Sequence, residues 1–455
     1  MAREFPLKPI RIQPVKTRYR RVKGPIPNAE TIRLIKQLRQ AEPISMRGQA
    51  PLIWDHSKGF SVCDAYGNQW LDFSSGVLIT NAGHSHPAIV KAIVNQAQKP
   101  LLTTYCFPNR PRIELAQKLI KVAPAPLKKV FLLSTGSEGL ECVLKLMRTY
   151  GVRKFGPRKK VIITFMRAFH GRTLGSQQLG GIPAGKAWIQ NLDPDIRQVN
   201  FPDGFRNKDT SFAGFEKALK QMKIRPDTVA GVVTETYQGG GTSFLPKAYA
   251  QALRKWCNRH GALLCFDEVQ AGFGRCGRMW GFEHYGVIPD LFCMGKGISS
   301  SLPISGVIGR PDVMDLYGPN EMTSTHSGNP VCAAAACASL DVIIKEKLVQ
   351  NSAKVGAILQ AELDAIKAAF PLVIAARHGM GLVAGMHMVK PGTEEPDGDL
   401  AWEIVYRCYL QGLLMFAPVG FGGATVKIAP PLCITADAVR EGCAVIRKTI
   451  AGLVG

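Results

Sequence analysis

Short apolar runs alternate with segments of helical spacing between about Leu101 and Glu346. Runs of this length, bounded by glycine, proline or polar residues, are typical of buried strands. The predicted strands are Lys129–Leu133, Val161–Phe165, Val229–Thr234, Leu263–Phe266, Leu291–Met294 and Ile304–Ile308. Ser137–Arg148 and Lys247–Arg259 have the pattern of amphipathic helices, and Gly261 ends the second. This alternation predicts an α/β domain with a mostly parallel sheet covered on both faces.

The pattern changes on both sides of this domain. Ile44–Phe73 alternates apolar and polar residues around a Gly67-Asn68 turn, which predicts a hairpin. Beyond Val349 the pattern predicts helices at Ala353–Ala369 and Ala436–Leu453 and strands at Val383–Met388 and Thr425–Ile428. We therefore predict a basic arm, a small α+β domain that is discontinuous in sequence, and a large domain between its two parts. The borders are residues 1–44 for the arm, 45–100 for the first part of the small domain with a linker helix, 101–346 for the large domain and 347–455 for the rest.

Composition describes an ordinary globular protein. The chain has 455 residues, 46% hydrophobic and 20% charged, which suits a large domain plus a smaller one. No apolar stretch approaches the roughly 20 residues that span a bilayer. Residues 1–40 lack the apolar core of a signal peptide. They are rich in arginine and nearly free of acidic residues, as matrix-targeting sequences are, but they are poor in serine and carry prolines that would break an amphipathic helix, so the cytoplasm is favoured. The 12 cysteines contain no CxxC pair, so we expect free thiols, no metal site and a cytoplasmic protein.

The formal charge of +23 raises the possibility of a nucleic-acid partner. Residues 1–40 hold eleven basic residues against Glu4 and Glu30, and 11 − 2 gives +9. The basic residues are Arg3, Lys8, Arg11, Lys16, Arg18, Arg20, Arg21, Lys23, Arg33, Lys36 and Arg39. The arm lacks the interleaved aromatic residues of a base-stacking surface. We expect it to lie across a partner subunit, and the remaining charge to steer anionic substrates to the site.

The residues with the most distinctive chemistry follow two neighbouring strands. Asp267 ends one apolar run, and Lys296 stands in a glycine-flanked turn after the next. A carboxylate for a ring nitrogen and a lysine for an aldehyde are what pyridoxal phosphate requires of a protein. Earlier in the chain, Ser134–Gly139 links a strand to a helix. The small residues of this loop would let backbone amides and the helix dipole bind a phosphate. Alternatively, the loop is an ordinary N-cap, in which a serine or threonine is followed three residues later by a glutamate.

Together with Gly272–Arg275 and Pro303–Gly306, the segment Phe266–Gln270 resembles the cofactor-binding core of class III (subgroup II) aminotransferases. The resemblance extends from about Ser45 to the C-terminus. It implies the fold of type I pyridoxal-phosphate transferases, with a mostly parallel seven-stranded sheet in the large domain and a small discontinuous α+β domain. It also decides between the alternatives for the loop at Ser134–Gly139 in favour of phosphate binding.

The resemblance implies a role for each matching residue. Lys296 would attach to the cofactor aldehyde and later move the substrate proton, Asp267 would pair with the ring nitrogen, Val269 would pack on the ring, and Gln270 would bond its hydroxyl oxygen. The remaining cofactor residues are Gly136 and Ser137 for the phosphate, Phe169 for stacking, and His170 and Glu235 beside the ring. Thr325 would reach the phosphate of a neighbouring subunit, which implies at least a homodimer and leaves a tetramer open.

Two positions depart from the family pattern. Many members have a glutamate where this chain has Gly240 and an arginine where it has Lys427, and this pair admits either an apolar or an acidic substrate end. Lysine keeps the charge but lacks the bidentate geometry of arginine. Val77 and Tyr105 match pocket positions, and their apolar or aromatic character suits a longer aliphatic or omega-amino substrate.

We therefore expect a transaminase that moves an amino group from an omega-amino acid or amine, such as 4-aminobutyrate, to a 2-oxo acid. A racemase or aminomutase of the same fold stays open, because all of these share the lysine. An alternative of another class is a non-catalytic binding protein of this fold that uses the basic arm. Neither the donor and acceptor nor the role of the arm follows from the sequence.

Overall fold

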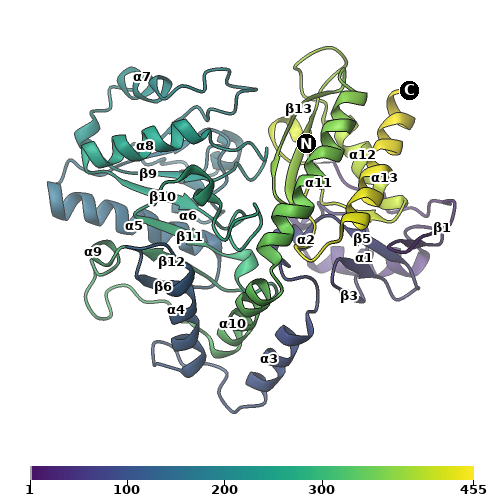
Figure 1. Ribbon diagram of the computed structural model, residues 1–455, viewed down its shortest axis with the longest axis horizontal. Coiled ribbons are helices and arrows are strands. Elements are labelled where there is room, and N and C mark those ends of the chain that lie inside the picture. The colour runs from purple at the N-terminus through teal and green to yellow at the C-terminus, as the bar shows by residue number, and fades with distance from the viewer. Residues whose placement is uncertain (1–2) are drawn as a thin grey trace. The chain divides into compact units, whose positions relative to one another are not determined.

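The computed structural model describes residues 3–455, and the chain divides into two compact units (Figure 1). The small unit combines the residues up to His86 with Gln350–Gly455, and the large unit is Pro87–Val349. The sequence analysis placed the borders of the large domain at residues 101 and 346. The helix that begins at Pro87, predicted as a linker, thus belongs to the large unit.

The large unit contains a seven-stranded sheet in the order β6-β12-β11-β10-β9-β7-β8. The β8–β7, β7–β9, β9–β10 and β10–β11 pairs are parallel, and β12 runs antiparallel to both of its neighbours. The prediction of a mostly parallel sheet is therefore confirmed. The strands are β6 (Lys129–Leu133), β7 (Val161–Phe165), β8 (Ile196–Val199), β9 (Val229–Glu235), β10 (Leu263–Asp267), β11 (Leu291–Met294) and β12 (Ser305–Gly309).

Helices of the large unit pack on this sheet. Figure 1 shows α5 and α8 beside it, and both contact β9. The helix α5 is longer than predicted, and its buried Leu140, Val143 and Leu146 share one core cluster with Val233 and Leu291 of the strands. Each such side chain stabilises the fold by about 1.5–3 kcal/mol relative to its exposed state. The helices are α3 (Pro87–Ala97), α4 (Arg110–Val122), α5 (Gly136–Phe155), α6 (Leu174–Leu179), α7 (Ala213–Gln221), α8 (Lys247–His260), α9 (Pro311–Met314) and α10 (Pro330–Lys345).

The small unit contains a six-stranded and a three-stranded sheet. The predicted hairpin is present: β4 and β5 pair antiparallel, and in the turn between them Asp64 accepts hydrogen bonds from the amides of Tyr66 and Asn68. The strands are β1 (Val15–Lys16), β2 (Arg21–Val22), β3 (His56–Lys58), β4 (Ser61–Cys63), β5 (Gln69–Asp72) and β15 (Leu413–Leu414) in one sheet, and β13 (Ile374–Met380), β14 (Val383–Met388) and β16 (Thr425–Ile428) in the other. The helices are α1 (Ala29–Ala41), α2 (Ser75–Leu78), α11 (Leu348–Ala369), α12 (Gly398–Leu410) and α13 (Ala436–Val454).

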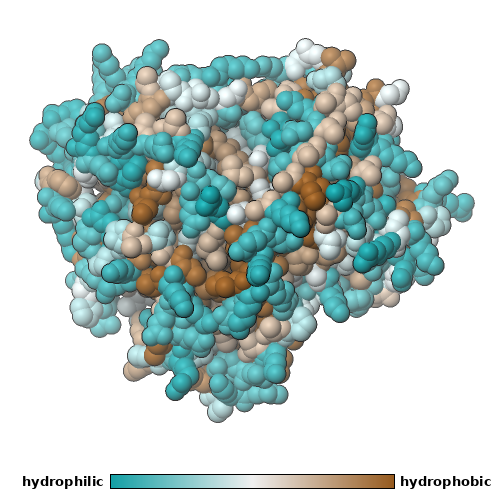
Figure 2. All heavy atoms as spheres, in the orientation of Figure 1, coloured by the Kyte–Doolittle hydropathy of each residue, from teal (hydrophilic) through white to brown (hydrophobic). Residues whose placement is uncertain are grey.

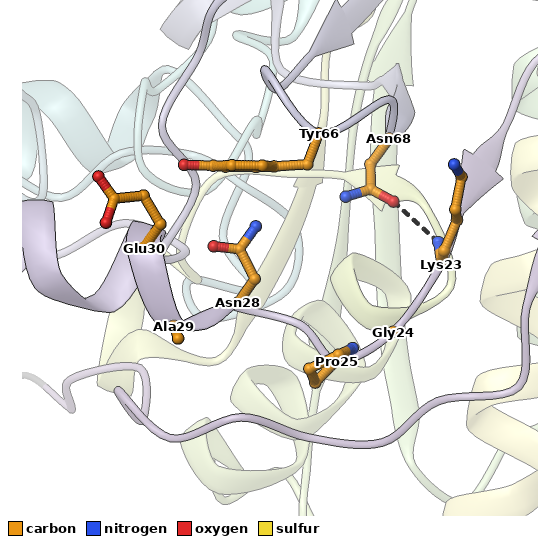
Figure 3. A pocket seen from close by; sticks show the side chains of 8 residues that line it. All are labelled: Lys23, Gly24, Pro25, Asn28, Ala29, Glu30, Tyr66 and Asn68. Atoms are coloured by element: carbon orange, nitrogen blue, oxygen red, sulfur yellow. Dashed lines mark hydrogen bonds between the residues drawn. The ribbon is translucent and has the colours of Figure 1, made fainter.

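The described part of the basic arm is built into the small unit. Val22 and Ile26 are buried, and Arg20 Nε bonds Glu441 Oε1 at 2.7 Å. The helix α1 begins two residues after Pro27 and was not predicted. Contact of the arm with a partner subunit stays a prediction. A hollow of about 380 Å³ lies beside the start of α1 (Figure 3), and it is lined by Lys23, Gly24, Pro25, Asn28, Ala29, Glu30, Tyr66 and Asn68.

Hydrophilic side chains are the most widespread on the face shown in Figure 2, and hydrophobic ones gather in a few smaller patches. Within residues 3–455, no helix combines the length and apolar character needed to cross a membrane. The same residues contain no group of three or more histidine, cysteine, aspartate or glutamate side chains placed to hold a metal ion. All 12 cysteines are free.

Candidate active site

The predicted cofactor residues meet at one edge of the large sheet. The strands β7, β9, β10 and β11 are parallel, so their carboxyl ends lie at the same edge, which is where ligands bind in open α/β sheets. Asp267 at the end of β10 lies in register with Glu235 on β9 and with Cys293 on β11. Lys296 follows the end of β11, and Phe169 and His170 follow the end of β7. The structure therefore gathers residues that are widely spaced in the sequence.

Asp267 is held by two hydrogen bonds. Its Oδ2 lies 2.8 Å from His170 Nδ1, and its Oδ1 accepts from the Val269 amide at 3.0 Å. Burial disfavours the His170 cation, but Asp267 and Glu235 outweigh burial, so the pKa of His170 is raised above its ordinary value. Within residues 3–455, the buried His170 Nε2 has no hydrogen-bond partner. The bond to the histidine therefore fixes the orientation of the carboxylate.

Glu235 joins two loops of the site. Its Oε2 accepts from the Phe169 amide at 3.2 Å, and its Oε1 accepts from the Gly239 amide at 2.7 Å. Burial raises the pKa of Glu235 to about 7, with His170 opposing the shift and Asp267 adding to it. This carboxyl group therefore positions the turn after β9 and the segment that carries Phe169.

Lys296 has an unusual backbone conformation. Its φ is +43°, in the left-handed region that a lysine rarely adopts, and residues held there cluster at functional sites. Burial lowers the pKa of the Lys296 amine, while Asp267 and Glu235 act in the opposite direction. The lowered pKa favours the neutral amine, which is the form that attacks a carbonyl carbon.

The loop between β6 and α5 has features of both alternatives raised by the sequence. It forms a capping box, since Glu138 Oε2 accepts from the amides of Ser134 (2.7 Å) and Thr135 (3.1 Å). The amides of Gly136 and Ser137 are the first two of α5, and such amides have no acceptor inside their own helix. The cap thus leaves those two amides for an anion.

The glycine at 136 is needed because of Val269. A Cβ at Gly136 would lie 3.0 Å from both Cγ atoms of Val269, so the loop and the apolar side chain approach closely. On the other side of the loop, Ser137 Oγ accepts from the Arg172 amide at 3.2 Å. The strand ends and the helix start therefore form one packed cradle.

The chemistry of this cradle fits pyridoxal phosphate. Asp267 is a fixed carboxylate for a protonated ring nitrogen, Val269 is an apolar side chain beside the phosphate loop, and Lys296 is a half-buried amine. Phe169 is 37% exposed although aromatic, which leaves a ring face available for stacking. Gln270 lies close to Gly239, because a Cβ there would be 2.4 Å from Gln270 Nε2.

The other predicted residues are more scattered. Tyr105 is exposed and its Oη lies 3.3 Å from Thr323 Oγ1, Thr325 is exposed, and Gly240 is half-buried in the turn after β9. Val77 and Lys427 belong to the small unit. Val77 is exposed on α2, whereas Lys427 is buried in β16 with its Nζ 5.8 Å from the centre of the Phe416 ring.

Glu268 was not predicted as a site residue, although it follows Asp267. It is fully buried and accepts hydrogen bonds from Thr236 Oγ1 and from the amides of Gly281 (2.6 Å) and Phe282 (3.2 Å). Burial raises the pKa of Glu268 to about 8. A second carboxylate at the end of an apolar strand was the available signal, but its partners lie in a segment that sequence patterns do not place.

Comparison with known proteins gives consistent results. The family model described as aminotransferase class-III matches residues 44–450. An isoleucine 2-epimerase from Lentilactobacillus buchneri is 34% identical, over 87% of this chain and 89% of that protein. A probable 4-aminobutyrate aminotransferase from Bacillus subtilis is 32% identical, over 86% of this chain and 90% of that protein. The crystal structure of an aminotransferase from Bacillus anthracis superposes with a TM-score of 0.85 at 27% identity and covers 94% of this chain and all of that one (100%).

Proposed function

This chain belongs to the class III aminotransferase family, whose enzymes depend on pyridoxal phosphate, and we propose that it transfers an amino group from an omega-amino acid or amine to a 2-oxo acid. The observation that carries the proposal is the group formed by Lys296, Asp267, His170 and Glu235 at the carboxyl ends of adjacent parallel strands. These residues supply a half-buried amine and a fixed carboxylate, which is what the cofactor requires.

Each residue has a defined task in this proposal. Pyridoxal phosphate supplies an aldehyde and an electron-withdrawing ring. Asp267, oriented by His170, would hold the ring nitrogen, while the Gly136 and Ser137 amides would hold the phosphate. Lys296 Nζ would hold the aldehyde carbon. When the donor amine has replaced it there, Lys296 would act as the base that accepts the proton from the carbon bearing the donor nitrogen. The lowered pKa of Lys296 supports this role, because only the neutral amine accepts a proton.

The remaining cofactor contacts support the same orientation of the ring. Phe169 would stack on one face, Val269 would pack on the other, and Gln270 would bond the ring hydroxyl oxygen. Glu235 positions Phe169 by accepting a hydrogen bond from its amide. Thr325 would contact the phosphate bound by a neighbouring subunit, so we propose a homodimer. We also keep the cytoplasm as the proposed compartment, which the free cysteines support.

The proposed donor is an omega-amino acid of the 4-aminobutyrate kind. Lys427 stands where many members of the family have an arginine, and its ammonium group would bind the distal carboxylate of the donor. Val77 and Tyr105 would line the aliphatic part of the pocket. The similarity to a protein named as a probable 4-aminobutyrate aminotransferase supports this choice.

A second candidate is epimerisation or racemisation of an amino acid. It is favoured by the similarity to a protein named isoleucine 2-epimerase, which is 34% identical to this chain. In that reaction, Lys296 would remove a proton from one face of the carbon and a proton would be added to the opposite face of the same carbon, so no 2-oxo acid is consumed.

One panel of donors and acceptors separates the two candidates. The purified holoenzyme is incubated with omega-amino acids, plain amines and single enantiomers of amino acids, each with and without a 2-oxo acid, and the products are separated on a chiral column. We expect amino transfer only when a 2-oxo acid is present, with 4-aminobutyrate or 5-aminovalerate among the best donors. Inversion of an enantiomer without any 2-oxo acid would replace the transaminase proposal with the racemase.

A further inference from the structure

The helix α2, Ser75–Leu78, is a single left-handed turn. The φ angles are +51° at Ser75, +58° at Gly76, +63° at Val77 and +64° at Leu78. Left-handed residues normally occur singly and as glycine, asparagine or aspartate, so a β-branched valine there is an outlier. Such a run persists only where its surroundings determine it, and strain of this kind clusters at functional sites.

A buried pair of side chains holds the two ends of the segment that contains this turn. His84 Nε2 lies 2.7 Å from Asp72 Oδ2, and the side chains are 3% and 0% exposed. The Asp72 amide donates to Phe60 O at 2.9 Å, while His84 is fixed by two backbone hydrogen bonds with Gly59, of 2.7 and 3.0 Å. The Asp72–His84 pair therefore joins the two ends of this segment, and backbone hydrogen bonds attach the same ends to the neighbouring residues Gly59 and Phe60.

The same carboxylate also reaches the start of the turn. Asp72 Oδ1 accepts from the amide (2.7 Å) and the hydroxyl (2.6 Å) of Ser74, and Ser74 Oγ accepts from the Gly76 amide at 3.1 Å. One residue on, Ser75 Oγ donates to Ala429 O at 2.6 Å. The bonds to Asp72 thus orient the residues that begin the left-handed turn.

Val77 is the side chain that this turn exposes. It is 42% exposed although apolar, whereas Ser75 and Leu78 of the same turn are buried. The Trp54 ring packs edge-on against His84, with 5.4 Å between the ring centres. A Cβ at Gly76 would lie 4.0 Å from the same indole. The surroundings therefore fix the backbone that carries Val77 while leaving the side chain available.

We propose that Asp72 and His84 are positioning residues for donor selection. The pair holds the left-handed turn so that Val77 stands rigidly against the aliphatic chain of the amino donor. The inference rests on the proposed function, in which Val77 lines the donor pocket. A rigid apolar contact discriminates between donors that differ by one methylene by about tenfold or more, whereas a mobile one adapts to both.

The test compares two variants of the holoenzyme. His84→Phe keeps a ring beside Trp54 and removes the bond to Asp72. Thr449→Val is the matched control, because it removes a buried hydroxyl of the same unit that accepts from Gln411 Nε2 at 2.9 Å. Hydrogen–deuterium exchange is followed at the amides of Leu78 and Ile79, which donate within the turn at 2.9 Å. We expect exchange at least tenfold faster in His84→Phe and unchanged in Thr449→Val.

The ratio of kcat/KM for 4-aminobutyrate to that for 5-aminovalerate gives the functional result. We expect Val77→Ala and His84→Phe to shift this ratio in the same direction by about tenfold, mainly through KM, while Thr449→Val leaves it unchanged. His84→Gln, whose amide can donate to Asp72, should restore much of the wild-type ratio, and it serves as the test variant if His84→Phe does not fold.

Two results would overturn the inference, and only the second would also contradict part of the proposed function. A loosened turn with a wild-type ratio, alongside a shifted ratio in Val77→Ala, refutes the positioning role and leaves the proposed function intact. A wild-type ratio in Val77→Ala itself removes Val77 from the donor pocket, and the inference falls together with that part of the proposed function.

Discussion

Gly171 is the position where a single added methyl group should separate cofactor binding from general stability. The residue lies between His170 and the loop that precedes α5, with φ at +132°. A Cβ there would lie 2.4 Å from Ser137 Oγ, 2.5 Å from Ser176 Oγ and 2.9 Å from Ser137 Cα. Rotating the two hydroxyls does not relieve the contact with Ser137 Cα, so Gly171→Ala must move the loop whose amides face the phosphate.

The free-energy cost of Gly171→Ala has two parts. A backbone with φ at +132° costs an alanine about 1–3 kcal/mol, which lowers the stability of the fold. Overpacking costs about 1–3 kcal/mol more. If the overpacking is relieved by displacing the phosphate loop, its free-energy cost weakens cofactor binding. The Kd for pyridoxal phosphate then rises by about 5- to 150-fold, since 1.4 kcal/mol corresponds to a factor of ten.

The assay is titration of the apoenzyme with pyridoxal phosphate, followed by the absorbance of the bound cofactor, together with the melting temperature. Gly156→Ala is the control, because Gly156 has φ at +97° and its Cβ would meet nothing within 4 Å. That variant should melt earlier and bind the cofactor with unchanged Kd. A Gly171→Ala enzyme whose Kd stays within about twofold of the wild type would refute the assignment of this loop to the phosphate.

Four further outcomes follow from the site. Asp267→Asn keeps the shape but removes the negative charge, so single-turnover rates should fall by several orders of magnitude while the cofactor stays bound; near-normal rates would make the carboxylate merely structural. Borohydride should fix the cofactor on Lys296, and Lys296→Ala should retain the cofactor without turnover; a reduced adduct mapped to another lysine would contradict this. Lys427→Met should raise KM for donors with a distal carboxylate about tenfold, the effect of roughly 1–2 kcal/mol for one charge contact, and should hardly change KM for plain amines. The pKa of Glu268 is raised from 4.5 to about 8, so the folded chain retains a proton that the unfolded chain releases, and wild-type stability falls as pH rises between those values; the melting temperature of Glu268→Gln should fall less over this range, with Glu235 still contributing, and an equal fall in both proteins would refute the prediction.

The sheet was largely predictable because its central strands are continuous apolar runs. For β6, β7 and β11 the predicted bounds match the structure. The strand β8 was missed, since its sequence has Arg197 and Gln198 between the two buried residues Ile196 and Val199, and it lies at the edge of the sheet. A strand with two apolar residues has too little periodicity to be distinguished from a loop.

The grouping of the residues proposed for the cofactor was predictable for a different reason. Asp267, Glu235 and Lys296 each follow a recognisable strand, and parallel strands bring their carboxyl ends to one edge. The contact between Asp72 and His84 had no such guide, because it joins two loop ends in the small unit. Nor did the sequence indicate the left-handed turn, since its valine favours extended backbone.

The turn at Ser75–Leu78 has a consequence for how this enzyme could diversify. Mutations that alter specificity usually weaken a fold, and that trade-off limits how many a protein accumulates. Here the residue proposed to face the donor is a valine with φ at +63°, a conformation that disfavours it by about 1–2 kcal/mol. Val77→Asn or Val77→Gly relieves that strain while reshaping the pocket. At this position a change of substrate range and a gain in stability can come from the same mutation, which makes it a favourable starting point for directed evolution.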